Sequence, residues 1–155
     1  MKYCFYYRTK IGMLAIVETN QKISDIFFEN QTVSEDIEVV ETVMIRECYL
    51  EIQEYLSKKR TKFELDFLLT GSDFAKLVYQ ELLKLPYGEV ITYKELAKRI
   101  KRPLAYRAVG NACKYNRLPL IIPCHRVIGS NQKLGGYAGG VEIKKQLLTL
   151  EDAKV

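Results

Sequence analysis

The hydrophobic pattern of this chain changes character near residue 70, and this change limits the fold more than any other feature of the sequence. Before it, residues 3–8, 13–18 and 22–28 are short segments rich in aromatic and β-branched side chains, as in β-strands. After it, apolar residues recur three or four positions apart, as on one face of a helix. We therefore predict an α+β chain of two domains, residues 1–70 and 71–155.

The first domain is predicted to be a small α/β scaffold with an antiparallel sheet. Ile45, Tyr49, Ile52 and Leu56 share one face of a helix that follows the three strands. The basic run 58–60 comes near the end of this helix, where positive charge suits the negative end of the helix dipole. Residues 63–67 alternate again and predict one more strand. No residue pattern in this domain indicates chemistry.

The second domain is predicted to be mostly helical. Ser72 is a suitable N-cap for a first helix, and Thr92 followed by Glu95 forms a capping-box pattern for a second. A further helix is expected over residues 104–115, and a last one over residues 141–150. Two short helices joined by a tight connection between residues 92 and 115 predict a helix-turn-helix, as in winged-helix-like domains.

Charge and cysteine content narrow the class of protein. Residues 1–71 hold nine Lys and Arg against twelve Asp and Glu, whereas residues 72–155 hold fifteen against seven, so a polyanionic partner is expected on the second domain. The four cysteines are scattered and no export signal is evident, which favours free thiols in a reducing cytoplasm. No apolar run is long enough to span a membrane. One histidine with scattered cysteines does not supply a metal-ligand cluster.

Residues 120–128 are the stretch in which chemistry is expected. Apolar residues flank Cys124, His125 and Arg126, and His125 is the only histidine of the chain. Pro123 indicates a stiff turn or the start of a helix rather than a central strand. A free cysteine is often only a small buried apolar residue. Here, however, the adjacent cations indicate a site, because a positive neighbour lowers a thiol's pKa and raises the fraction of reactive thiolate.

Two further stretches of the second domain are poor in large side chains. The helix expected over residues 104–115 carries Ala105, Ala108, Gly110 and Ala112, with Arg107 among them. Such a face suits either close helix packing or close, sequence-indifferent contact with a nucleic-acid groove. Residues 135–140 form a glycine-rich loop that lacks the Lys-Ser/Thr ending of a phosphate-binding loop, which excludes nucleotide hydrolysis.

The motif Pro-Cys-His-Arg-Val at residues 123–127 resembles the active-site motif of the O6-alkylguanine-DNA alkyltransferases. Four further segments match the same family in order and spacing, at residues 86–93, 107–110, 136–140 and 147–151. The resemblance implies direct reversal of DNA damage. A methyl or larger alkyl group would pass from O6 of guanine, and from O4 of thymine, in duplex DNA to the protein's own cysteine, once per molecule and with no cofactor or metal. It also implies a monomer that acts in the cytoplasm.

The resemblance further implies roles for individual residues. Cys124 would be the alkyl acceptor, His125 the base acting through a water molecule, and Glu151 the group that orients His125. Asn116 would tie the helix-turn-helix to the site. The implied DNA-contacting residues are Tyr93, Ala105, Arg107, Ala108, Gly110 and Lys114, and the implied base pocket comprises Tyr137, Ala138 and Gly139.

In the family's pattern, Tyr93 would crowd the phosphate beside the target nucleotide and help to rotate it outward, and Arg107 would fill the vacated place in the base stack. The chain departs from that pattern at Tyr106 and Asn111, which are bulkier than usual, at Arg117, and at Ala138, which lacks a hydroxyl. Three rival functions are a lesion-binding protein without transfer activity, a helix-turn-helix regulator and a thiol hydrolase.

Overall fold

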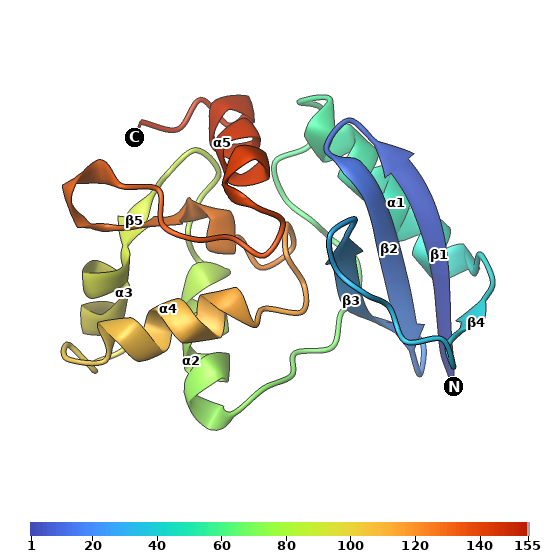
Figure 1. Cartoon of the computed structure of the whole chain (residues 1–155), viewed down its shortest axis with the longest axis horizontal. Helices are drawn as coiled ribbons and strands as arrows, with labels where there is room; N and C mark the ends of the chain where they lie inside the picture. The colour runs from blue at the N-terminus through green and yellow to red at the C-terminus, as the bar shows by residue number, and fades with distance from the viewer. Residues whose placement is uncertain (155) are drawn as a thin grey trace. The chain divides into compact units, whose positions relative to one another are not determined.

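The structure is a computed structural model (Figure 1). It describes residues 1–154, except for the side chain of Gln132. The chain divides into two compact units, Met1–Thr70 and a second that begins at Gly71. The first unit contains a sheet with one helix, and the second is mostly helical, which confirms the predicted α+β class. Each unit is described by itself.

The sheet of the first unit has the strand order β3-β2-β1-β4. Antiparallel hairpins join β1 (Lys2–Thr9) to β2 (Gly12–Thr19) and β2 to β3 (Lys22–Phe28), as predicted. The short β4 (Glu38–Val39) was not expected, and it pairs parallel to β1. The strand predicted over residues 63–67 is wrong, because this segment makes only one isolated bridge, between Ile23 and Phe67.

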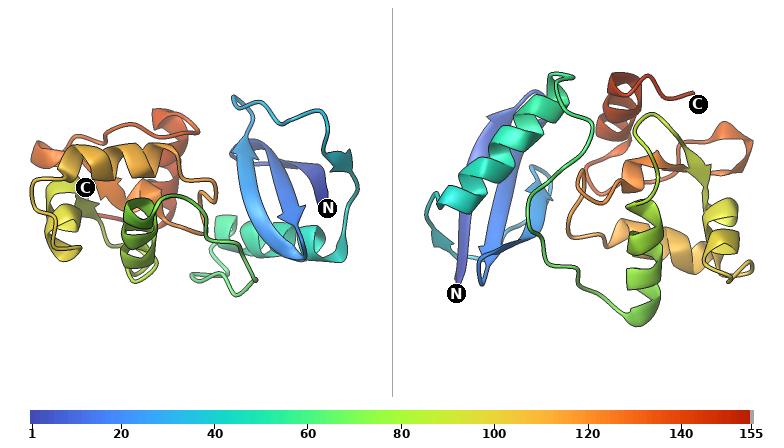
Figure 2. Two further views of the ribbon diagram at one scale, coloured as in Figure 1. Left: turned by 90° about the horizontal axis from the view of Figure 1, so that it is seen from below. Right: turned by 180° about the vertical axis from the view of Figure 1, so that it is seen from behind.

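Helix α1 (Val43–Leu56) covers one face of this sheet, as Figure 2 shows from behind. Its buried side chains include Ile45 and Ile52, two of the residues predicted to face inward. The opposite face of β2 is covered by a smaller cluster in which Ala15 and Val17 pack against Val33 and Ile37. Because both faces are covered, five consecutive residues of β2 are buried, although an exposed sheet face would give a strict alternation.

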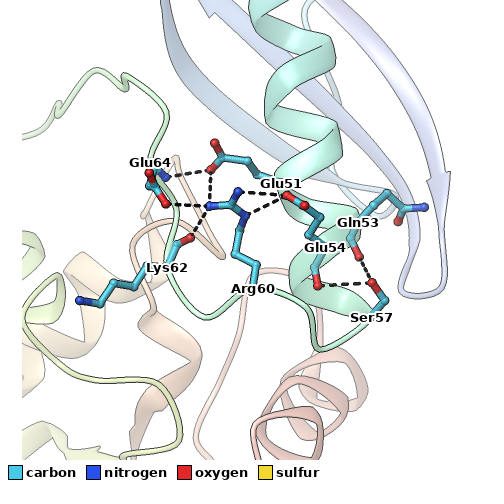
Figure 3. A network of polar contacts seen from close by, with 7 residues as sticks. All are labelled: Glu51, Gln53, Glu54, Ser57, Arg60, Lys62 and Glu64. Carbon is cyan, nitrogen blue, oxygen red and sulfur yellow. Dashed lines mark hydrogen bonds and ion pairs between the residues drawn. The ribbon is translucent and has the colours of Figure 1, made fainter.

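Arg60 joins the segment after α1 back to that helix (Figure 3). Its guanidinium lies 3.0 Å from a carboxylate oxygen of Glu54, 3.7 Å from Glu51 and 3.4 Å from Glu64, and it donates to the Lys62 carbonyl at 2.9 Å. The helix itself ends at Leu56, with no basic residue in its last turn. The basic run 58–60 follows the end of the helix, as predicted, and Arg60 in addition forms ion pairs.

The second unit begins with two helices whose caps were predicted. Ser72 Oγ accepts from the Ala75 amide at 3.1 Å at the start of α2 (Asp73–Leu82), and Thr92 Oγ1 accepts from the Glu95 amide at 3.0 Å at the start of α3 (Tyr93–Arg99). Helix α4 (Tyr106–Lys114) follows after a tight connection and packs against α3 and α2, which gives the predicted helix-turn-helix.

The rest of the second unit surrounds a short 3₁₀ helix, η1 (Cys124–Arg126). The strand β6 (Val127–Ile128) follows it and pairs parallel with β5 (Ile91–Thr92). A loop that includes the 3₁₀ turn η2 (Ser130–Gln132) leads to the last helix, α5 (Val141–Leu150), whose bounds match the prediction. Among residues 1–154, no helix is both long and apolar enough to cross a membrane.

We expect Arg60→Ala to loosen the segment after α1. An ion-pair network of this kind contributes about 1 kcal/mol, which corresponds to roughly fivefold faster amide hydrogen exchange in residues 57–64. Exchange followed by mass spectrometry measures this effect. The matched control is Arg8→Ala on β1, whose arginine is exposed. Identical exchange in Arg60→Ala and the unchanged protein would show that the network does not stabilise the segment.

Candidate active site

The backbone before Cys124 is held in an unusual conformation. Pro123 directly precedes η1, which confirms the turn or helix start expected there. Three residues earlier, buried Leu120 has a φ of 76°, in the left-handed region that costs a branched residue about 1–2 kcal/mol. The surrounding packing must offset this cost, because every residue from Leu118 to Ile128 is buried. Cys124 therefore lies on a rigid segment and keeps only 4% of its surface exposed.

Asn116 connects the end of α4 to the thiol. Its Nδ2 donates to Cys124 Sγ at 3.2 Å and to the Ile122 carbonyl at 3.0 Å, while its Oδ1 accepts from the Leu118 amide at 2.9 Å. The amide is buried and uses both its donor and its acceptor sides, so its orientation is fixed. It can therefore donate a hydrogen bond to the sulfur, which stabilises a thiolate more than a thiol.

Burial raises the pKa of the Cys124 thiol above its ordinary value. The Asn116 hydrogen bond and the positive charge of Lys144 act in the opposite direction, but they do not outweigh burial. A positive neighbour does lower the pKa of this thiol, as expected, but burial outweighs that effect. The sulfur rests as a thiol and needs a base before it can act as a nucleophile.

The carboxylate of Glu151 collects four hydrogen bonds at the end of α5. It lies 2.7 Å from His125 Nε2, accepts from Arg126 at 2.8 and 3.0 Å, and accepts from the Gly88 amide at 3.0 Å. Burial would raise the pKa of this carboxyl, but the bonds from His125 and Arg126 hold it well below its usual range. Arg126 also donates to the Leu85 carbonyl at 2.8 Å, so the ion pair fixes three separate segments of the unit.

The tautomer of His125 follows from its contact with Glu151. Burial lowers the imidazole's pKa, so the ring is neutral at pH 7 and carries one N–H. Because Glu151 is ionised, the proton belongs on Nε2, where the carboxylate accepts it. The nitrogen that can take up a proton is then Nδ1. If it does, the Glu151 carboxylate stabilises the imidazolium that results.

Lys144 was missed by the sequence reasoning, although it lies on the inward face of α5. The ammonium group is fully buried and donates to the Val127 carbonyl at 2.7 Å and to the Gly136 carbonyl at 3.2 Å, joining β6 to the glycine-rich loop. It also lies 5.9 Å from the centroid of the Tyr93 ring. The available signal was its position three residues before Leu147 on the buried stripe of the helix.

Tyr93 is packed between α4 and the glycine-rich loop. A methyl group added at Gly110 would meet the ring at an ordinary 3.7 Å, but one added at Gly135 would lie 2.7 Å from the phenol oxygen. Close packing against the Tyr93 ring therefore requires a glycine at position 135 but not at position 110. Burial, together with the nearby Cys113 and Cys124 thiols, raises the pKa of Tyr93 to about 12, so the phenol keeps its proton.

The predicted DNA-contacting residues in and just before α4 are exposed or half-buried, whereas the thiol is buried. Arg107, Ala108 and Lys114 are exposed, whereas Ala105 and Gly110 are half-buried. Tyr106 and Asn111 share this surface, and Lys94 of α3 lies 5.3 Å from the centroid of the Tyr106 ring. Tyr79 of α2 fixes α4 from its buried side by donating to the Ala112 carbonyl at 2.7 Å.

The predicted pocket residues Tyr137, Ala138 and Gly139 are all partly exposed. The Tyr137 ring stands edge-on to His125, with 6.5 Å between centroids, so the loop passes beside the imidazole. Within residues 1–154, no group of three or more His, Cys, Asp or Glu side chains could hold a metal ion. The site thus combines a buried thiol, a histidine hydrogen-bonded to a carboxylate, and a basic helix surface.

Comparisons with known proteins agree with this arrangement. Residues 73–153 match the DNA-binding domain of 6-O-methylguanine DNA methyltransferase, and residues 2–69 match its ribonuclease-like domain. The chain is 38% identical to the constitutive methylated-DNA–protein-cysteine methyltransferase of Bacillus subtilis, covering 97% of this chain and 96% of that one. A second relative with that name, from Methanosarcina barkeri, is 50% identical over 69% of this chain and 68% of its own length.

The fold is also similar to a solved structure, Mycobacterium tuberculosis OGT in complex with DNA. The TM-score is 0.91 at 33% identity, with 97% of this chain and 92% of that chain covered. Fold and site thus define a DNA-repair protein that uses a cysteine as its alkyl acceptor. The chain belongs to the 6-O-methylguanine DNA methyltransferase family.

We expect Gly135→Ala to disturb the site and Gly136→Ala to be tolerated. The first substitution places a methyl group on the Tyr93 hydroxyl at a residue whose φ is +76°, while nothing lies within 4 Å of the second position. Strain of this kind costs about 1–3 kcal/mol. Urea unfolding of the two variants measures it. Equal loss of stability in both would show that Gly135 is not in contact with Tyr93.

We expect Glu151→Gln to lower the free energy of unfolding by about 3 kcal/mol at pH 7, because it leaves Arg126 as an unpaired buried charge. The folded-state pKa of Glu151 is depressed, so its stabilising effect is complete above the unfolded pKa of about 4.3 and is lost as the pH falls below it. The stability difference between the variant and the unchanged protein should therefore shrink in acid. Exposed Glu142→Gln in the first turn of α5 is the control, and a difference constant from pH 7 to about pH 3 would contradict the assignment.

Proposed function

We propose that this protein repairs alkylated DNA by direct reversal, taking the alkyl group from O6 of guanine, and from O4 of thymine, onto its own Cys124. The observation that carries the proposal is the buried Cys124 thiol, bonded to Asn116 and adjacent in sequence to a histidine that a carboxylate holds at 2.7 Å. The protein acts on duplex DNA as a monomer, and each molecule acts once, because the thioether product is stable.

The first step removes the thiol proton. Cys124 and His125 are neighbours in η1 and their side chains diverge, so the proton travels to His125 Nδ1 through a water molecule. Glu151 stabilises the imidazolium that forms, and Asn116 Nδ2 and the Lys144 ammonium stabilise the thiolate. This division of charge explains how a thiol with a raised pKa can still act as a nucleophile at neutral pH.

In the second step the thiolate attacks the alkyl carbon in line with the breaking bond to the base oxygen. A sulfur–carbon bond forms, the carbon–oxygen bond breaks, and the electron pair passes to the guanine. The phenol of Tyr93, which keeps its proton at neutral pH, donates a hydrogen bond to the departing oxygen. The proton taken from the thiol ends on the guanine, so the site returns to its starting charge.

The alkylated base must leave the base stack to reach a buried sulfur. Flipping a nucleotide costs a few kcal/mol, and least for a mispaired lesion. Exposed Arg107 at the start of α4 occupies the place that the base vacates, while Lys114 and neighbouring cations contact phosphates. The loop at residues 137–139 then forms one wall of the base pocket, where the backbone of Ala138 takes the place of a side-chain hydroxyl.

We expect incubation with duplex DNA that carries one O6-methylguanine to add a single methyl group to Cys124, one per protein molecule. Mass spectrometry of the intact protein and of its peptides measures the stoichiometry and the position. Cys124→Ser should bind the same DNA and transfer nothing, because an alcohol is a far weaker nucleophile than a thiol. Cys48→Ser is the matched control, since Cys48 is a buried cysteine of α1 in the first unit.

The same measurement separates the rival functions. Tight binding without transfer would identify a lesion-binding protein, and several turnovers per molecule would identify a thiol hydrolase. Equal affinity for damaged and undamaged DNA, with no transfer, would identify a helix-turn-helix regulator. A methyl group found on a cysteine other than Cys124 would reject the acceptor assignment itself.

A further inference from the structure

The connection between α3 and α4 is a rigid hydrogen-bonded turn with an apolar tip. Helix α3 ends in two bonds, from the Lys101 amide to the Lys98 carbonyl and from the Arg102 amide to the Ala97 carbonyl, each at 2.9 Å. The Ala105 amide then donates to the Arg102 carbonyl at 2.9 Å, which closes a β-turn with Pro103 and Leu104 at its centre. The backbone therefore fixes Leu104 at the outermost point of the connection.

Leu104 is 90% exposed, more than any other large apolar side chain in the part of the chain that the structure describes. A single exposed apolar residue is ordinary on a protein surface. Here the exposure is imposed by an ordered turn, because Pro103 restricts φ and the Ala105 amide is already bonded. The side chain cannot turn inward without breaking that bond.

The surroundings of Leu104 are strongly cationic. Residues 100–117 contain five Lys and Arg, all of them exposed, and no Asp or Glu. Lys101, Arg102 and Arg107 are exposed within three residues of Leu104 along the chain. A patch of one sign fits a polyanion rather than an ordinary protein surface, where both signs alternate. Of the polyanions, duplex DNA presents rows of phosphates next to the apolar faces of its sugar rings.

We propose that Leu104 is an uncharged DNA contact that packs against the sugars of the groove that receives α4, between the phosphates bound by its cationic neighbours. This inference rests on the proposed function, since it assigns one more positioning residue to the same DNA-bound state. The cations supply affinity that salt weakens, whereas Leu104 supplies affinity that does not depend on salt, because removing apolar surface from water releases no counterions.

The test compares DNA binding of Leu104→Ala and the unchanged protein over a range of salt concentrations, with a duplex that carries O6-methylguanine. We expect Leu104→Ala to bind about tenfold more weakly at every salt concentration, from the loss of buried apolar surface, with the slope of log affinity against log salt unchanged. Arg102→Ala should instead reduce that slope by about one. Leu104→Met should restore most of the affinity, because it keeps the apolar volume.

Val43→Ala is the matched control, because Val43 is 76% exposed and lies at the start of α1 in the first unit. Unchanged affinity in Leu104→Ala, or a weaker salt slope in that variant, would overturn the inference. So would binding of anionic lipid vesicles by the unchanged protein that Leu104→Ala abolishes. The result is separable from the proposed function, because methyl transfer to Cys124 is measured on the unchanged protein, whereas the role of Leu104 is measured by the salt dependence of DNA binding.

Discussion

The site depends on one buried carboxylate. Glu151 caps the C-terminal end of α5, where the helix dipole disfavours a negative charge, and it is buried as well. Two bonds from Arg126, one from His125 and one from the Gly88 amide offset both penalties. These donors come from the turn after α2 and from η1. The same carboxylate therefore joins both segments to the end of α5 and selects the tautomer of His125. Fold stability and the proposed base catalysis therefore use one group.

Burial of the thiol has a chemical consequence. A sulfur that is 4% exposed, with a raised pKa, reacts slowly with soluble oxidants and alkylating agents. The same burial means that the thiol must lose its proton to a base before it can react with its substrate. In the proposed mechanism, Asn116 and Lys144 stabilise the thiolate and His125 takes the proton. Removal of the thiol proton is therefore the step that activates the proposed acceptor.

Local signals in the sequence predicted the elements but not the polar contacts across the second unit. The caps Ser72 and Thr92 and the bounds of α5 follow from patterns within a few residues, and the structure has them. The sequence motif placed Cys124, His125 and Glu151 in one site, but Lys144 was missed because a lysine is normally assigned to the exposed face of a helix. The formation of strand β4 and the single bridge made by residues 63–67 depend on pairing with distant strands. No local sequence pattern encodes such pairing.

Helix α4 connects the surface that is proposed to contact DNA with the proposed acceptor sulfur. Its first turns present Arg107 and Ala108 to solvent, while its last turn carries buried Cys113 and leads directly to Asn116, which bonds the acceptor sulfur. Tyr79 fixes the helix from behind through the Ala112 carbonyl. One helix of nine residues therefore connects the surface proposed to contact DNA with the segment that carries Asn116.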